Sequence, residues 1–200
     1  MTLVAQIVVH DEAEYIAVNS TTGRAYHASE GTSEIAVIDG STNTVLAFIP
    51  LIIEESIPLI IDAGPTIPYQ IAIDEAQNII YVGAKSPEPE AKSPNPLIPD
   101  ANGKYGCKAM RELPSDEAPA GQEELDCWHA GVVFVIDGNT NQVVSYFLAG
   151  DDPEGVMFAK ATGKVYASNE DDGSITVAKG AKRNTNGSIT PPQVIGTIRH

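Results

Sequence analysis

The sequence predicts an all-β protein composed of three β-propeller blades, each of four antiparallel strands, with a long loop insertion in the middle blade. The first observation is an internal repeat, because V-I-D-G-x-T-N-x-V occurs at residues 37–45 and again at 135–143. In each copy, an alternating apolar run, a turn-forming cluster and a second alternating run follow one another, as in a β-hairpin. The larger unit returns after about 42 residues where nothing is inserted, a length typical of a four-stranded blade.

Twelve strands are expected, four in each blade. Each second strand carries a tyrosine at the same place, preceded by a short turn: Tyr26, Tyr81 and Tyr166. The expected strands are residues 15–19, 24–28, 35–39 and 45–51, then 69–74, 79–83, 132–137 and 143–148, and finally 155–159, 164–168, 175–178 and 194–198. A proline-punctuated insertion over residues 52–67 is either an extra strand pair or a long excursion.

These elements predict a single propeller-type domain over residues 1–200. Blade 1 covers about 14–51, blade 2 about 68–149 with its insertion at 84–130, and blade 3 about 153–199, while residues 2–9 form an extra strand. Closed propellers have roughly 4–8 blades, so three blades leave two open faces that expose apolar surface. Three arrangements would cover these faces: a second copy completing a six-bladed ring, blades from another chain in a larger complex, or the remainder of a longer chain.

The blade units resemble a known repeat. A-V-N-S-T-T-G-R-A-Y, I-A-I-D-E-A-Q-N-I-I-Y-V and F-A-K-A-T-G-K-V-Y-A-S-N are similar to the YVTN (YncE-like) β-propeller repeats of bacterial and archaeal surface-layer and periplasmic proteins. That family includes scaffold and binding proteins and is distantly similar to lyase and lactonase propellers. The resemblance, together with the cysteine pair, favours a periplasmic, extracellular or cell-surface location. No signal peptide is visible, so a cytoplasmic location is the alternative.

Charge and hydropathy exclude two classes of partner. The formal net charge is −15, which argues against nucleic acid, whose phosphates require a basic face. No apolar stretch approaches the roughly 20 residues of a membrane-spanning helix. The acidic charge is typical either of a surface that keeps the protein in solution or of a surface that binds a cationic partner.

The insertion in the middle blade contains both cysteines, Cys107 and Cys127. If oxidised, the pair would close a loop of about 20 residues and contribute around 3 kcal/mol. With His129 the two thiols would instead make a partial zinc site, for which a fourth ligand is not in evidence. The insertion is also the expected contact with other proteins, through apolar and aromatic side chains among charged ones: Tyr105, Met110, Leu113 and Trp128.

Acidic residues lead into the first strand of two blades. In a propeller the first strand lines the central channel, so these acids would ring one mouth of the channel and could hold a divalent cation. The candidates are Asp11, Glu12, Asp151, Asp152 and Glu154. A solvated acidic rim is the alternative. The Asp-Gly sequences in the repeated motif, Asp39 and Asp137, and the acidic run at residues 169–173 are interpreted as turns.

We therefore expect a non-enzymatic scaffold or accessory subunit that mediates protein–protein interaction. The alternatives are a lyase- or lactonase-like propeller enzyme and a ligand-binding propeller, each with an acidic or metal site at the channel mouth. No G-x-S-x-G, H-E-x-x-H or glycine-rich phosphate loop occurs in the sequence. No catalytic residue is predicted, and no cofactor other than that divalent cation.

Overall fold

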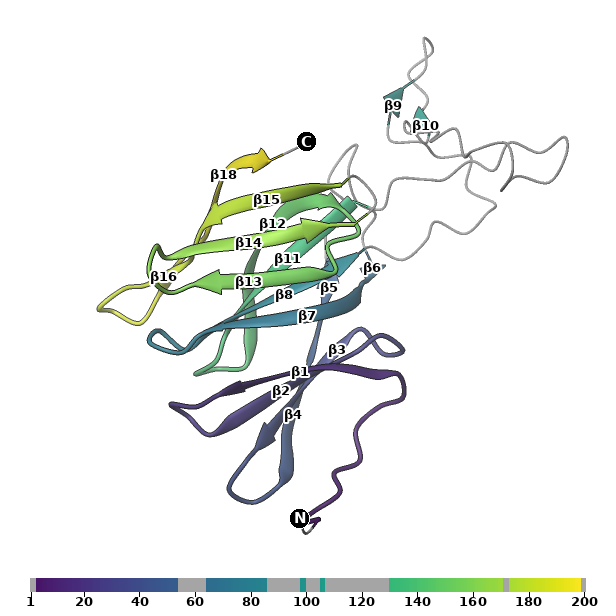
Figure 1. The fold of residues 1–200 in the computed structure, drawn as a ribbon. Helices are drawn as coiled ribbons and strands as arrows, with labels where there is room; N and C mark the ends of the chain where they lie inside the picture. The colour runs from purple at the N-terminus through teal and green to yellow at the C-terminus, as the bar shows by residue number, and fades with distance from the viewer. Residues whose placement is uncertain are drawn as a thin grey trace, which may run out of the picture.

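The fold is all-β in the computed structural model, which describes residues 3–53, 64–85, 98–99, 105–106, 130–170 and 173–198 (Figure 1). Over these ranges every regular element is a strand. No helix in the described part of the chain is long and apolar enough to cross a membrane.

Three antiparallel sheets of four strands form the body of the protein. Blade 1 has the order β1 (Ala13–Asn19), β2 (Arg24–Ser29), β3 (Glu34–Asp39), β4 (Thr44–Pro50). Blade 2 contains β7 (Ile67–Asp74), β8 (Ile79–Lys85), β11 (Ala130–Asp137) and β12 (Gln142–Asp151). Blade 3 contains β13 (Gly155–Ala159), β14 (Lys164–Asn169), β15 (Ser174–Lys179) and β18 (Gln193–Ile198). The expected fold class is confirmed, and each expected strand is present with ends shifted by no more than three residues.

Short two-stranded pairs lie within the connections between these strands. β5 (Ile52–Ile53) pairs with β6 (Gly64–Pro65), so the first insertion begins and ends in an extra strand pair. β9 (Ile98–Pro99) pairs with β10 (Tyr105–Gly106), and β16 (Lys182–Arg183) pairs with β17 (Ile189–Thr190). Because β8 ends at Lys85 and β11 begins at Ala130, the insertion in the middle blade occupies residues 86–129.

The repeated Asp-Gly turns are held by their own side chains. Asp39 Oδ1 accepts a hydrogen bond from the backbone amide two residues later at 2.7 Å, and Asp137 Oδ1 does the same at 2.8 Å. Asn43 and Asn141 then adopt left-handed conformations with φ of 56° and 55°. Asparagine tolerates this region better than most residues, so the interpretation of both motifs as turns is confirmed.

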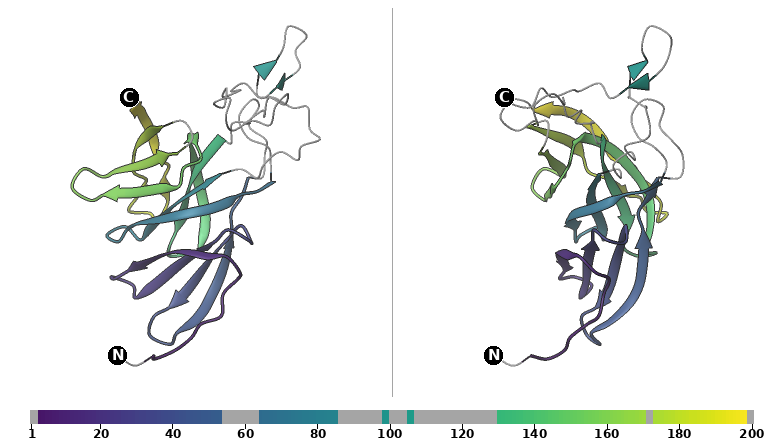
Figure 2. Two further views of the ribbon diagram at one scale, coloured as in Figure 1. Left: turned by 45° about the vertical axis from the view of Figure 1, so that its right-hand side comes forward. Right: turned by 90° about the vertical axis from the view of Figure 1, so that its right-hand side faces the viewer.

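The hydrophobic core has two parts, one on each face of the middle blade. Phe134 and Val82 are 0% exposed and pack toward blade 1, whereas Tyr81 and Val133 are 0% exposed and pack toward blade 3. Neighbouring residues along a strand point to opposite faces, so these strands are apolar at nearly every position. The three sheets are arranged side by side around one inner edge, where β7 contacts β1 on one side and β13 on the other (Figure 2).

Each terminal blade has one face that no neighbouring blade covers, although two side chains at the centre of that face of blade 1, His27 and Ala36, are buried. The open face of blade 1 includes Ile16 and Phe48, which belong to one cross-strand row and are 64% and 42% exposed. The open face of blade 3 includes Met157 on β13 and the paired Ile175 and Ile198, which are 68%, 39% and 57% exposed. Both faces expose apolar side chains, and neither has a neighbouring blade. Blade 2, in contrast, is covered by blade 1 on one face and by blade 3 on the other.

Residues 3–10 differ from the expectation of an extra strand over residues 2–9. They pair with no strand among the described residues, and Leu3, Val4 and Val8 are 80%, 87% and 85% exposed. The segment contacts blade 1 through His10, whose ring lies 4.5 Å from the ring of Phe48. Apolar alternation predicts extended chain, but a strand also requires a hydrogen-bonded neighbour, which this part of the sequence does not supply.

Candidate functional site

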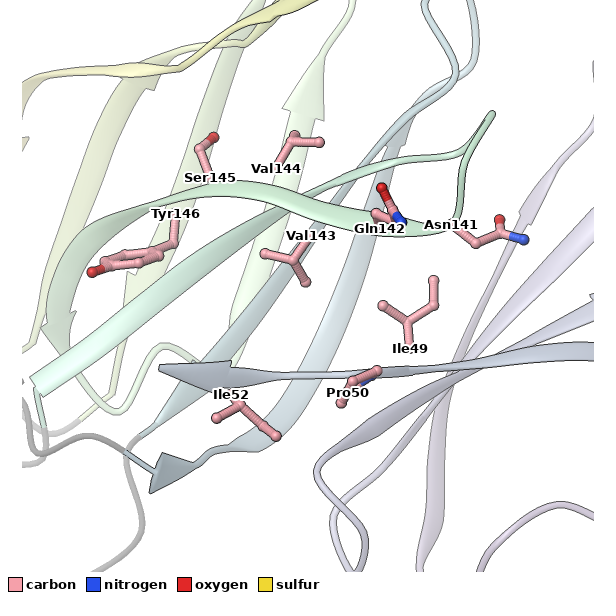
Figure 3. Close-up of a pocket in the computed structure, with 9 residues that line it drawn as sticks. All are labelled: Ile49, Pro50, Ile52, Asn141, Gln142, Val143, Val144, Ser145 and Tyr146. Carbon is pink, nitrogen blue, oxygen red and sulfur yellow. The ribbon is translucent and has the colours of Figure 1, made fainter. Parts of the chain in front are cut away.

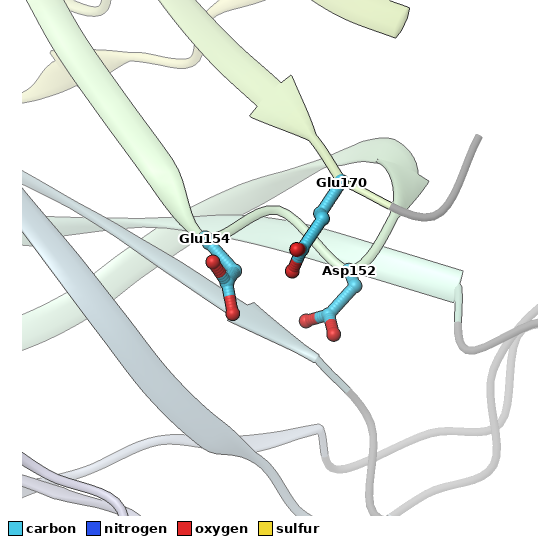
Figure 4. A group of neighbouring side chains, drawn as sticks. All are labelled: Asp152, Glu154 and Glu170. Carbon is cyan, nitrogen blue, oxygen red and sulfur yellow. The ribbon is translucent and has the colours of Figure 1, made fainter. Parts of the chain in front are cut away.

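Three carboxylates meet where blade 3 joins blade 2, at the end of the inner strands predicted to be the channel mouth. Asp152 and Glu154 precede β13, and Glu170 follows β14. One carboxylate oxygen from each lies within 4.8 Å of the others, and Figure 4 shows the groups turned toward a common space. We call these three residues the mouth cluster.

Hairpin register brings the mouth cluster together. In the β13–β14 pair Gly155 lies opposite Ser168, so the residues just before β13 lie beside those just after β14. The backbone carbonyl of Asp152 accepts hydrogen bonds from the amides of Glu154 and Glu170, both at 2.9 Å. Asp152 has a φ of 46°, a left-handed conformation that costs energy for a residue other than glycine. These two backbone bonds hold Asp152 in that conformation.

Lys85 supplies the positive charge beside the cluster. It is the last residue of β8, and its Nζ lies 3.2 Å from Asp152 Oδ2 and 5.4 Å from the centre of the Tyr69 ring. The two side chains of the ion pair are 19% and 10% exposed. Burial disfavours the ammonium ion of Lys85, but hydrogen bonds with Tyr69 and Asp152 outweigh burial and raise its pKa. Lys85 is therefore charged at every physiological pH.

The environment of the mouth also shifts the pKa values of Tyr69 and Glu154. Burial is the main cause that raises the pKa of Tyr69 to about 12. Burial likewise raises the pKa of Glu154, and the neighbouring carboxylates of Glu170 and Asp152 add to that shift. Two like charges at close range cannot both ionise freely. Glu154 therefore holds a proton more readily than an ordinary glutamate does.

Equivalent positions in the three blades alternate in charge. Four residues after the shared tyrosine of the second strand, the blades carry Glu30, Lys85 and Glu170 in turn. The charge of Glu30 contributes to the raised pKa of Tyr69, which places it at the same mouth. The basic residue of the middle blade thus lies between acidic residues of the two outer blades.

The structure brings together some of the predicted acidic residues and not others. Asp152 and Glu154 lie side by side, whereas Asp11 and Glu12 belong to the corresponding corner of blade 1. Glu12 has a φ of 56°, and its backbone carbonyl accepts a hydrogen bond from the amide of Glu30 at 3.3 Å. Blade 1 thus repeats the backbone arrangement of Asp152 and Glu170 in blade 3. The side chain of Asp151 lies outside the described residues. Sequence reasoning missed Lys85, although its place after the shared tyrosine was a usable signal.

The residues predicted in the long insertion stay predictions. Of Tyr105 only the backbone is described, as part of β10. The other five lie outside the described residues: Cys107, Met110, Leu113, Cys127 and Trp128. The disulfide, the partial zinc site and the aromatic contact surface are therefore untested by the structure.

A groove of about 590 Å³ lies elsewhere, on the outer rim between blades 1 and 2 (Figure 3). Its walls come from β4 and β5 on one side and from the turn before β12 and the start of β12 on the other. Ile49, Ile52 and Val143 contribute apolar surface. None of the nine described lining residues is an acid, a histidine or a cysteine, and Tyr146 is the only one of the nine with an ionisable side chain.

Comparisons with known proteins agree on the architecture. The chain superposes on U3-55K with a TM-score of 0.55 at 11% identity, and on the WD40 repeats of RRP9 with 0.54 at 11%. WD40 repeats are propeller blades of four strands. The chain is a partial β-propeller. It is also similar to the hydrazine synthase of Kuenenia stuttgartiensis, with a TM-score of 0.53 at 16% identity.

These similarities concern the fold alone. The alignments cover 96%, 97% and 96% of this chain but only 41%, 40% and 40% of U3-55K, the hydrazine synthase and RRP9. The chain therefore spans about two fifths of the length of the propellers that it matches. No protein-family model and no curated protein sequence matches it.

Proposed function

We propose that the chain is a non-enzymatic propeller scaffold that binds other protein chains through the open faces of blades 1 and 3. The observation that carries this proposal is the contrast between blades. Phe134 and Tyr81, on opposite faces of blade 2, are both 0% exposed, while Ile16 and Met157 on the open faces are 64% and 68% exposed. Apolar surface of this kind on a folded domain marks an interface.

The occupant that best fits each open face is another propeller blade, supplied by a second copy of the chain. The face of blade 2 that packs on blade 1 shows which surface covers a blade in this fold, namely a second four-stranded sheet. Two copies related by a two-fold axis would place blade 3 of one against blade 1 of the other at both junctions. Such a pair makes six blades, within the roughly 4–8 of closed propellers, and cyclic dimers are the commonest oligomers. The alternatives are blades from a different chain in a larger complex and further blades of a longer chain, either of which would also cover these faces.

Finer assignments rest on the sequence. The resemblance to YVTN (YncE-like) repeats and the pair Cys107 and Cys127 support a scaffold or accessory subunit in the periplasm, outside the cell or on its surface. The mouth cluster supports the second candidate, a ligand-binding or lyase- or lactonase-like propeller, because three carboxylates gather there and one of them, Glu154, has the raised pKa that is common at functional sites.

Charged substitutions on the open faces test the scaffold proposal. Ile16→Glu and Met157→Glu each place a carboxylate on a surface that the partner blade would desolvate, so each should weaken self-association at least tenfold in sedimentation velocity. The matched control is Val144→Glu, because Val144 is 43% exposed but lies on the outer strand β12 of blade 2. The control should associate as the unchanged chain does. Equal association by all four proteins would refute the proposed use of the faces.

A further inference from the structure

We infer that the mouth cluster binds one hard divalent cation of the calcium type, held by Asp152, Glu154 and Glu170. The site lies at the junction of blades 2 and 3, and all of its residues belong to this chain. It therefore goes beyond the scaffold function and does not require a completed ring.

The spacing of the carboxylates fits a single ion. Calcium binds oxygen ligands at roughly 2.3–2.6 Å, so two oxygens on the same ion can be no more than about 5 Å apart. The ligand atoms of the mouth cluster all lie within 4.8 Å of one another. The three carboxylates point toward one another beside the start of β13 and the end of β14, as Figure 4 shows. An all-oxygen donor set selects hard cations over zinc or copper.

A second observation concerns Asp152 alone. Its side chain is 10% exposed, and its Oδ1 is buried without a hydrogen-bond partner among the described residues. The other oxygen, Oδ2, is paired with Lys85. A buried carboxylate oxygen without a partner is costly, and it is rare in folded proteins unless water or an ion satisfies it. A cation bound at the mouth cluster would supply the missing partner.

Charge balance points the same way. The three carboxylates face one ammonium group, that of Lys85, which is committed to Asp152. On the β7 side the backbone amide of Gln70 donates to the carbonyl of Glu154, and the neutral side chain of Gln70 accepts the amide of Val156 at 3.0 Å. Excess negative charge therefore remains at the site, and a divalent cation would neutralise it better than a monovalent one.

The test is calorimetric titration of the full chain with calcium chloride, after treatment with a chelator, at pH 7 and in about 0.15 M potassium chloride to screen diffuse charge. One saturable site is expected. Glu154→Gln and Glu170→Gln should each weaken binding at least tenfold. The control is Glu75→Gln, which removes the same charge in the turn at the opposite end of β8, where Glu75 accepts the amide of Ser20 at 2.7 Å. Its affinity should stay within about twofold of the unchanged chain.

Two outcomes would overturn the inference. One is the absence of saturable binding by a chain whose circular dichroism and thermal transition are those of the folded protein. The other is equal affinity in all four proteins, which would mean diffuse counterion binding to the acidic surface. Neither depends on self-association, so failure of this site and failure of the scaffold proposal are distinguishable.

Discussion

Phe134→Ala is expected to lower the free energy of unfolding by about 3–5 kcal/mol, the usual cost of removing a buried aromatic ring. Phe134 is 0% exposed at the centre of β11, where it lies opposite Val82 of β8 and Tyr146 of β12. Its ring meets that of Tyr146 edge-on at 6.1 Å. The middle blade has packed neighbours on both faces, so little movement is available to fill the cavity. Urea denaturation followed by circular dichroism measures the loss.

The control for this substitution is Val144→Ala on the adjacent strand β12. Val144 is 43% exposed, and an exposed substitution of this kind should change stability by about 0.5 kcal/mol or less. Equal losses for the two variants would contradict the assignment of Phe134 to the core between blades 1 and 2.

Lys85→Met is expected to lower the free energy of unfolding at pH 7 by about 3 kcal/mol, because it leaves the largely buried Asp152 carboxylate without its partner. Methionine keeps most of the apolar stem that packs on Tyr69, so the loss reports the charge. Asp152, Glu154 and Glu170 would then repel one another with no ammonium group among them.

The loss should be smaller at pH 5. A carboxyl group whose pKa is raised in the folded state, as that of Glu154 is, binds more protons when folded than when unfolded. Stability from this group therefore increases as the pH falls, and protonation also relieves the repulsion left by Lys85→Met. Thermal denaturation of variant and unchanged chain at both pH values gives the difference. An equal difference at pH 7 and pH 5 would show that Lys85 acts through packing alone.

Local patterning was enough to predict the blades. Alternating apolar residues set the strands, and turn residues such as Asp39 and Asn141 set their ends, because both effects act between near neighbours in sequence. Shared Tyr26, Tyr81 and Tyr166 revealed the repeat because each occupies the same position of a second strand. The fold class follows from such local rules.

The mouth cluster could be predicted only in part. The approach of Glu170 to Glu154 follows from hairpin register, but the contact of Lys85 with Asp152 depends on how one blade packs on the next. Packing between blades joins residues far apart in sequence, and no periodicity specifies it. Residues 3–10 show the same limit, since their apolar pattern gives no strand partner.

The native mass of the chain, measured by light scattering during size-exclusion chromatography, tests most directly whether the open faces are covered by a second copy. The account predicts a particle of twice the 21.2 kDa chain mass that persists on dilution to micromolar concentration. A particle of 21.2 kDa at every concentration, with the faces around Ile16 and Met157 still accessible to solvent in hydrogen exchange, would contradict it.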